Sequence, residues 1–216
     1  MFGHQKASMI LYDLIETFLR GIEGRIGRYL RYGYYKMRLK QCGRGVVIDS
    51  GVHIIQPSMI ELGDRVWIDR NAILIAGKIE TQEKNFRTIQ NPYFKGQSGE
   101  IHIGSYSHIG IGTIIQGHGG VFMDHYCTTS AGCKIYSFSN DPERSRKGTM
   151  IDTAYIVHPV MVEENVWLGL NTIVLGHHIG KNSFVKPNSV IYKDVSADTI
   201  YDGVSDQSIP RNLKDA

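Results

Sequence analysis

Cysteine is scarce in this sequence, and a long hydrophobic run is missing. Its three cysteines, Cys42, Cys127 and Cys133, form no CxxC pair, so the set does not suggest a disulfide framework and suits a reducing compartment. No stretch approaches the roughly 20 apolar residues of a membrane span. Asp13 and Glu16 interrupt the apolar residues near the N-terminus, and no small-residue cleavage site follows. We therefore expect no signal peptide and a cytoplasmic protein.

A strong charge of one sign is also missing. The chain carries 24 basic and 21 acidic residues, and its net charge of +3 gives no reason to expect general nucleic-acid binding. The apolar share of 42% is sufficient for an ordinary folded core. A length of 216 residues suits one domain with an appendage.

A six-residue repeat runs through most of the chain. The second residue of each six is often Gly, Asp or Glu. The first residue is nearly always aliphatic, at Ile48, Ile54, Leu62, Ile68, Leu74, Ile103, Ile109, Ile115, Met123, Thr129, Ile135, Val162, Leu168, Ile179, Val185 and Ile191. The fifth is small or β-branched, at Val52, Ser58, Val66, Ala72, Ser107, Thr113, Cys127, Cys133, Val166, Thr172, Ser183 and Ser189.

This spacing predicts an all-β fold, a parallel β-helix of hexapeptide repeats. Side chains alternate faces along a strand, so positions one and five can both point inward, while Gly, Asn and Asp in between favour turns. Each coil then covers the next, and the core is a stacked column. The alternative is a β-sandwich, whose strands recur every 8–12 residues or so. The step from Leu168 to Ile173 is five rather than six, so we expect a contracted corner there.

Two polar stretches break the repeat, at 81–100 and 138–155. We expect them to protrude from the column as loops, where binding and catalysis are often found, although a tolerated insertion is the alternative for the first. The predicted organisation is a helical segment over 1–44, a β-helix domain over 45–195 and a C-terminal tail over 196–216.

The first forty residues have a helical pattern. Gly21, Gly24 and Gly27 weaken its middle and favour two helices. One apolar face is predicted from Ile10, Leu11, Leu14, Ile15, Phe18, Leu19, Ile22 and Ile26. The segment is basic, with Arg20, Arg25, Arg28, Arg31, Lys36, Arg38 and Lys40. We expect a helical cap on the open end of the column, which is compatible with a peripheral membrane surface.

Two segments carry a resemblance to a known family. The repeats and the run PVMVEENVWLGLNTIVLGHHIGKNSFVKPNSVIYKDV (159–195) resemble the sugar O-acetyltransferases of the hexapeptide-repeat superfamily. The run GRIGRYLRYGYYKMRLKQCGRGVVIDSGVHI (24–54) is similar to the members found in surface-polysaccharide clusters. The resemblance implies a left-handed β-helix and a homotrimer with acetyl-CoA, the co-substrate, in a groove between columns. It also implies transfer of an acetyl group to a hydroxyl of a surface-polysaccharide, nucleotide-linked or lipid-linked sugar.

Such a transfer needs a base for the hydroxyl proton. The family supplies it as a histidine on the loop after a run like CKIYSFS, a position that falls here at Asn140 or Asp141. An amide is no base, and Asp141 can replace imidazole only if burial raises its pKa. His118, between glycines one coil below the loop, is the best other candidate, followed by His125 and His158; for each, a surface or corner role is the alternative.

On the cofactor side, the resemblance assigns Gly169, Ser189 and Lys193 to acetyl-CoA, with Lys193 at a phosphate. Pro187 and Asn188 stand where the family has Ala-Gly. One alternative is therefore a catalytically impaired scaffold or sugar-binding β-helix.

The less favoured alternative is a zinc protein of the gamma-class carbonic-anhydrase type. His102 and His108 are six residues apart and His118 and His125 seven, and neither matches that class, so we expect no metal.

Overall fold

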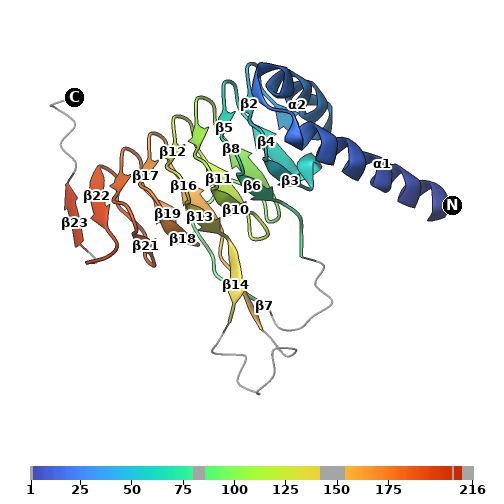
Figure 1. Cartoon of the computed structure of the whole chain (residues 1–216). Helices are drawn as coiled ribbons and strands as arrows, with labels where there is room; N and C mark the ends of the chain where they lie inside the picture. Colours follow the sequence, from blue (N-terminus) through green and yellow to red (C-terminus); the bar gives the residue numbers. More distant parts are fainter. Residues whose placement is uncertain (1, 80–85, 142–153, 206, 211–216) are drawn as a thin grey trace.

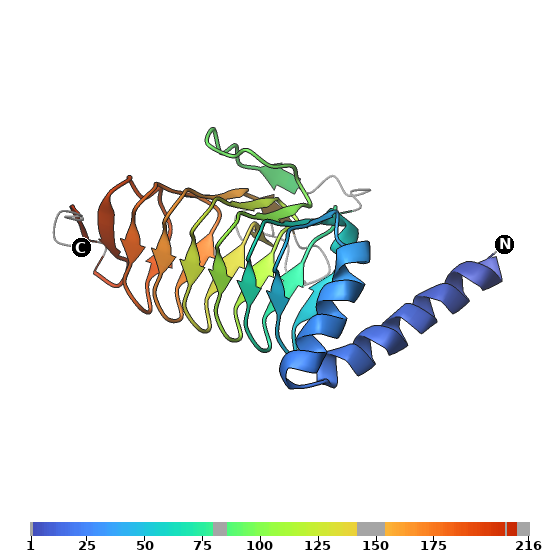
Figure 2. The same cartoon turned by 90° about the horizontal axis from the view of Figure 1, so that it is seen from above.

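The computed structural model describes residues 2–79, 86–141, 154–205 and 207–210. Parts of both predicted loops (81–85 and 142–153) and of the tail (206 and 211–216) lie outside the described residues. Strands that follow one another in the chain fall in turn on three sheets, which form the sides of one column (Figures 1 and 2). Every ladder between neighbouring coils is parallel, as in β2–β5 and β5–β9. The predicted parallel β-helix is confirmed, and the β-sandwich is excluded.

The first sheet contains β1 (Gln41–Cys42), β4 (Ile60–Leu62), β8 (Ile101–Ile103), β11 (Val121–Met123), β16 (Val160–Val162) and β19 (His178–Ile179). The second contains β2 (Val47–Ile48), β5 (Trp67–Ile68), β9 (His108–Ile109), β12 (Thr128–Thr129), β17 (Trp167–Leu168), β20 (Phe184–Val185), β22 (Thr199–Asp202) and β23 (Gln207–Pro210). The third contains β3 (His53–Ile55), β6 (Ile73–Ile75), β10 (Ile114–Gln116), β13 (Lys134–Tyr136), β18 (Ile173–Leu175) and β21 (Val190–Ile191). The column thus continues through β22, beyond residue 195.

The aliphatic first positions form the core, as predicted, with one correction. Val174, not Ile173, points inward: Val174 is fully buried and pairs with Ile135, whereas Ile173 is half-buried. The step after Leu168 is therefore six, and no contraction occurs at that corner. The shorter step lies between Val174 and Ile179, at the corner before β19.

The fifth positions are buried where they were predicted to be, except Ser58. Ser58 is exposed because a short 3-10 helix, η1 (Pro57–Met59), adds residues to that corner. The buried hydroxyls bond to the backbone of the neighbouring coil: Ser107 accepts from the amide of Cys127 at 3.1 Å and donates to the carbonyl of Asp124 at 3.2 Å. Small polar residues are tolerated inside the column because their hydrogen bonds are satisfied there.

The helical cap is confirmed, but one helix makes it. α2 (Gly24–Arg38) covers the end of the column with Gly27, Arg31 and Tyr35, whereas α1 (Phe2–Gly21) projects away from it (Figure 2). The predicted apolar face is therefore not covered as a whole: Phe18 on α1 and Ile26 on α2 are each 72% exposed. Arg31, expected to add to the basic surface, is buried instead.

The two protruding loops contain strands that the sequence did not predict. β7 (Phe86–Thr88) pairs in parallel with β15 (Tyr155–Val157), which pairs antiparallel with β14 (Phe138–Asn140). The Tyr155 ring stacks on both Phe86 and Phe138, and the centroids of the three rings lie 5.0 to 6.4 Å apart. Both loops therefore leave the column as one small sheet (Figure 1).

Candidate functional site

The irregular connections gather on one edge of the column, where the chain passes from the third sheet to the first. The two loops leave from this edge, after β6 and after β13. The short connections after β10, β18 and β21 turn there as well and carry His118, His177 and Asp194. We call this the loop edge. Three of the cavities found in the molecule lie along it.

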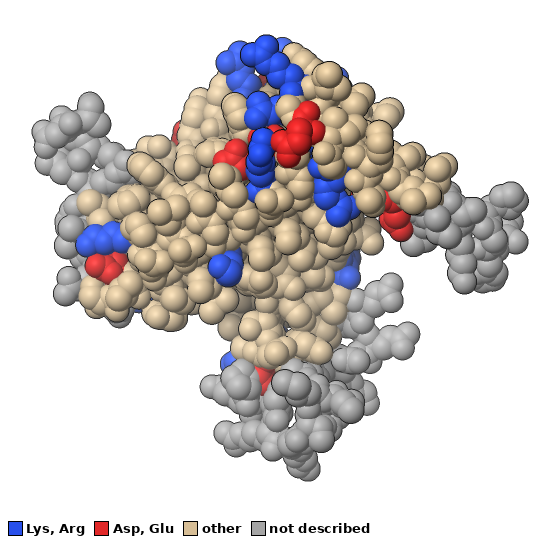
Figure 3. All heavy atoms as spheres, in the orientation of Figure 1, with Lys and Arg blue, Asp and Glu red and all other residues tan. Residues whose placement is uncertain are grey.

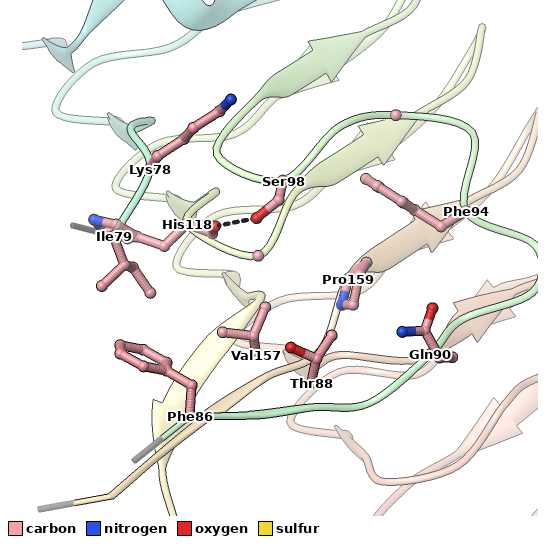
Figure 4. Close-up of a pocket in the computed structure, with 12 residues that line it drawn as sticks. Lys78, Ile79, Phe86, Thr88, Gln90, Phe94, Ser98, His118, Val157 and Pro159 are labelled. Atoms are coloured by element: carbon pink, nitrogen blue, oxygen red, sulfur yellow. Dashed lines mark hydrogen bonds between the residues drawn. The ribbon is translucent and has the colours of Figure 1, made fainter. Parts of the chain in front are cut away.

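The largest of these three cavities has His118 in its wall and a volume of about 450 Å³ (Figure 4). We call it the His118 cavity. Its walls are mostly apolar, and a few polar groups reach into it, which is typical of small-molecule sites. It is lined by Lys78, Ile79, Phe86, Thr88, Gln90, Phe94, Gly96, Ser98, His118, Gly119, Val157 and Pro159.

The His118 ring is half-buried, not exposed as the flanking glycines had suggested. Its Nδ1 is buried and has no hydrogen-bond partner among the described residues. Burial lowers the pKa of His118 below its ordinary value, so the imidazole is neutral at neutral pH and able to accept a proton. The Ser98 hydroxyl donates to the His118 carbonyl at 3.1 Å, which ties the first loop to this turn (Figure 4).

Two adjoining cavities, of about 340 and 280 Å³, form a second cleft farther along the loop edge. They share Ile89, His158, His177 and Tyr192. The ring centroids of His158 and His177 are 4.6 Å apart. Burial lowers the pKa of His158, and the nearby charge of His177 lowers it further. Nδ1 of His177 lies 3.4 Å from Oδ1 of Asp194.

This His158–His177 cleft brings together three residues predicted from the sequence. Asn140 lines one cavity, Lys193 lines the other, and His158 lines both. Gln90 lines both the Lys193 cavity and the His118 cavity, so the cleft adjoins the His118 site.

Asp141, the other loop position, is fully buried and lines none of these three cavities. Its Oδ2 accepts a hydrogen bond from Nε of Arg87 on β7 at 2.9 Å, and its amide donates to the carbonyl of Ala154 at 2.7 Å. Since β7 belongs to the first loop and Asp141 to the second, the ion pair holds the two loops together. This geometry makes Asp141 a residue that positions the loops.

Comparisons with known proteins agree with this architecture. No family model matches the sequence. A galactoside O-acetyltransferase from Lactococcus lactis is 27% identical over 111 residues, which cover 50% of this chain. The chain spans about half (51%) of the length of that relative.

Solved structures match over most of the length. A variant of the N-acyltransferase AntD from Bacillus cereus, in complex with dTDP and coenzyme A, is 24% identical and covers 84% of this chain and 89% of its own, with a TM-score of 0.67. A hexapeptide-repeat-containing acetyltransferase from Vibrio cholerae is 20% identical and covers 97% of this chain and 92% of its own, with a TM-score of 0.57. The chain is a left-handed hexapeptide-repeat β-helix. The predicted left-handed β-helix is thereby confirmed, and the sequence relative is an O-acetyltransferase, as the resemblance to sugar O-acetyltransferases implied.

In this β-helix two of the residues expected at acetyl-CoA serve the packing of coils. A Cβ on Gly169 would lie 2.6 Å from the backbone nitrogen of Pro187, so glycine is required for the next coil to stack. Ser189 is fully buried and accepts from the amide of Gly203 at 2.9 Å. Lys193 alone of the three is exposed.

The other histidines from the sequence also lie in the column. His102 pairs with Glu61 at 3.0 Å on the first sheet, and His108 pairs with Asp69 at 2.8 Å on the second. His125 accepts from the amide of Ser105. Within the described residues, no three His, Cys, Asp or Glu side chains are grouped closely enough to hold a metal ion.

Sequence reasoning did not identify His177, although a signal was present. His118 and His177 each follow a glycine, and each stands two residues after a strand of the third sheet, β10 or β18. The dipeptide Gly-His at this corner marks the loop edge in two coils.

Proposed function

We propose that the protein transfers an acetyl group from acetyl-CoA to a hydroxyl of a sugar, with His118 as the general base. The imidazole takes the hydroxyl proton as the sugar oxygen attacks the thioester carbonyl. The C–S bond then breaks, and the proton passes to the departing sulfur. Holding the two reactants side by side in adjoining cavities removes much of the entropic barrier.

The observation that carries this proposal is the state of His118. The neutral imidazole lines a cavity between the two loops, and its buried Nδ1 has no hydrogen-bond partner within the described residues. The similar solved structures support acyl-CoA as the donor, since one contains acetyl-CoA and another 3-hydroxybutyryl-CoA.

For the donor we propose the His158–His177 cleft. It adjoins the His118 cavity, and Lys193, which resemblance assigns to a phosphate of the cofactor, lines one of its two cavities. The burial of Ser189 and the packing role of Gly169 leave Lys193 as the cofactor residue to test.

The test compares His118→Gln with His125→Gln, a histidine at an exposed corner. The assay is release of free thiol from acetyl-CoA in the presence of nucleotide-linked sugars. His118→Gln should lower kcat/KM about a hundredfold or more, the ordinary contribution of a general base, while His125→Gln should stay near the wild type. Equal turnover by both variants would contradict the assignment. Tight CoA binding with no turnover on any acceptor would favour the scaffold alternative.

A second candidate function is acyl transfer to an amino sugar. One AntD variant, an N-acyltransferase, is in complex with dTDP-4-amino-4,6-dideoxyglucose and coenzyme A. A neutral amine is a stronger nucleophile than a hydroxyl and attacks without first losing a proton, so a weak base of lowered pKa such as His118 suffices. Offering the amino and hydroxyl forms of the same nucleotide sugar separates the two functions by their kcat/KM.

We also propose a cytoplasmic homotrimer that works at the inner face of the membrane. An apolar surface suited to contact with neighbouring columns is exposed on the second sheet and the corner after it. It consists of Trp67, Trp167, Ile111 and Leu170. Light scattering coupled to size exclusion measures the mass, and a mass of one chain would contradict the trimer.

A further inference from the structure

We propose that the N-terminal helices form a docking surface for an anionic lipid bilayer. No described helix is long and apolar enough to cross a membrane, so the contact lies on the surface. The docking surface consists of an apolar stripe on each helix, basic side chains beside it and a groove beneath α2. It is distinct from the loop edge and does not depend on the acyl transfer.

The apolar stripes come from helical spacing. At about 100° per residue, Leu11, Leu14 and Phe18 lie within about 60° on α1. Eight of the 19 large hydrophobic side chains that are exposed in the described residues lie on the two helices. They are Leu11, Tyr12, Leu14 and Phe18 on α1 and Ile26, Tyr29, Leu30 and Met37 on α2.

On α2 the stripe faces away from the column. Ile26, Leu30 and Met37 lie within about 40° of one another, whereas the buried residues Arg31 and Tyr35 lie on a different side of the helix. Ile26 is 72% exposed and Met37 80%. Because the column needs none of these side chains for its own core, their apolar surface is available to a partner.

The charge of the molecule is divided along its length. Residues 1–44 contain nine basic and three acidic side chains, a net +6, whereas residues 45–216 contain 15 basic and 18 acidic, a net −3. Basic side chains accordingly gather over the α2 end of the molecule (Figure 3). This end is therefore complementary to an anionic surface, and the same end of a second copy would meet it with a like charge.

A groove beneath α2 suits a lipid phosphate. It has a volume of about 340 Å³ and lies between α2 and the first coil, lined by Arg25, Arg28, Tyr29, Tyr32 and Gly45–Val47. Arg28 is held by the buried Asp49 at 2.9 Å, whereas Arg25 has no ion pair within the described residues. Basic heads beside tyrosine rings are typical of membrane interfaces.

The experiment is sedimentation with vesicles of phosphatidylcholine alone or with 30% phosphatidylglycerol. The protein should bind the anionic vesicles at least tenfold more tightly, and 0.5 M NaCl should reduce that binding. The double variants Arg25→Glu/Lys36→Glu and Phe18→Asp/Ile26→Asp should each weaken it at least tenfold. Matched controls at the far end, Lys181→Glu and the 74% exposed Val204→Asp, should leave it unchanged.

Several results would overturn the proposal. Equal binding to both kinds of vesicle would contradict a preference for anionic lipid. An equal loss of vesicle binding in the helix variants and the control variants would contradict a specific role of the helices. If Phe18→Asp/Ile26→Asp lowers the mass of the assembly and leaves vesicle binding unchanged, the stripes bind a second copy instead. Circular dichroism of each variant verifies that the column is folded.

Discussion

Arg31 offers a sharp test of how the helices are attached to the column. Its side chain is 1% exposed. Nε donates to the carbonyl of Ile48 at 2.9 Å, and Nη1 donates to the carbonyls of Leu19 and Ile22 at 2.6 and 2.7 Å. Because the last carbonyls of a helix have no partner within the helix, this one guanidinium joins the end of α1 to the first coil through α2.

The size of the effect follows from these contacts. A hydrogen bond from a charged donor contributes about 1.5–3 kcal/mol, so three such bonds form a large gross term. The opposing term is the cost of burying the guanidinium, which lowers the pKa of Arg31 and leaves Nη2 without a partner within the described residues. For Arg31→Met we therefore expect a net loss of about 2–4 kcal/mol in the local stability of the helices.

Hydrogen exchange measures this loss directly. Amides of α2 should exchange about 30- to 700-fold faster in Arg31→Met, since each 1.4 kcal/mol is about tenfold, while amides in β8 to β13 should be unchanged. The control is Arg44→Met, because the Arg44 side chain is 91% exposed and its ion pair with Asp64 is a surface pair. If both variants exchange alike, the anchoring role of Arg31 is refuted.

Two further predictions concern the site. Because burial lowers the pKa of His118 and the base must be neutral, kcat/KM should be flat from pH 7 to 8 and fall only at a pH below the ordinary histidine value of about 6.5; a pH profile that falls already near pH 7 would contradict this. Asp141→Asn should lower turnover at least tenfold, because it releases the Arg87 contact between the loops. The midpoint temperature of thermal unfolding should stay near that of Arg44→Met. Unchanged turnover would mean that the ion pair does not position the loops.

The column could be predicted from the sequence because its pattern is strictly local. Each inward position faces the same chemical demand, so Ile48, Ile68 and Ile109 repeat along the chain and are all fully buried. The pattern failed where two neighbours satisfy that demand equally. Ile173 and Val174 are both aliphatic, and only the pairing with β13 determines which of them points inward.

The loops and the N-terminal helices show what a local pattern omits. β7 is a strand because it pairs with β15, a contact between segments far apart in the sequence, and FRT alone carries no strand period. The apolar face of α1 was expected to pack on the column because helical spacing does not say what covers it. Arg31 looked like surface charge because its three carbonyl partners are invisible in a sequence.

The column carries a histidine, His118, near the place where the loop lacks one. Asn140 lies on β14, in a loop whose position depends on the Arg87–Asp141 pair, whereas His118 lies in a tight turn between two stacked strands, β10 and β11. Gly120 makes that turn with φ of +98°, and a Cβ there would strike the ring of Phe94, so the turn and the first loop fix each other. A base carried by the column is held more accurately than one carried by a loop.

Since successive coils are about 4.8 Å apart, His118 and His177 lie about two coils, or roughly 10 Å, from each other along the same edge. A donor held at His177 therefore has to extend only along the column to reach the base at His118.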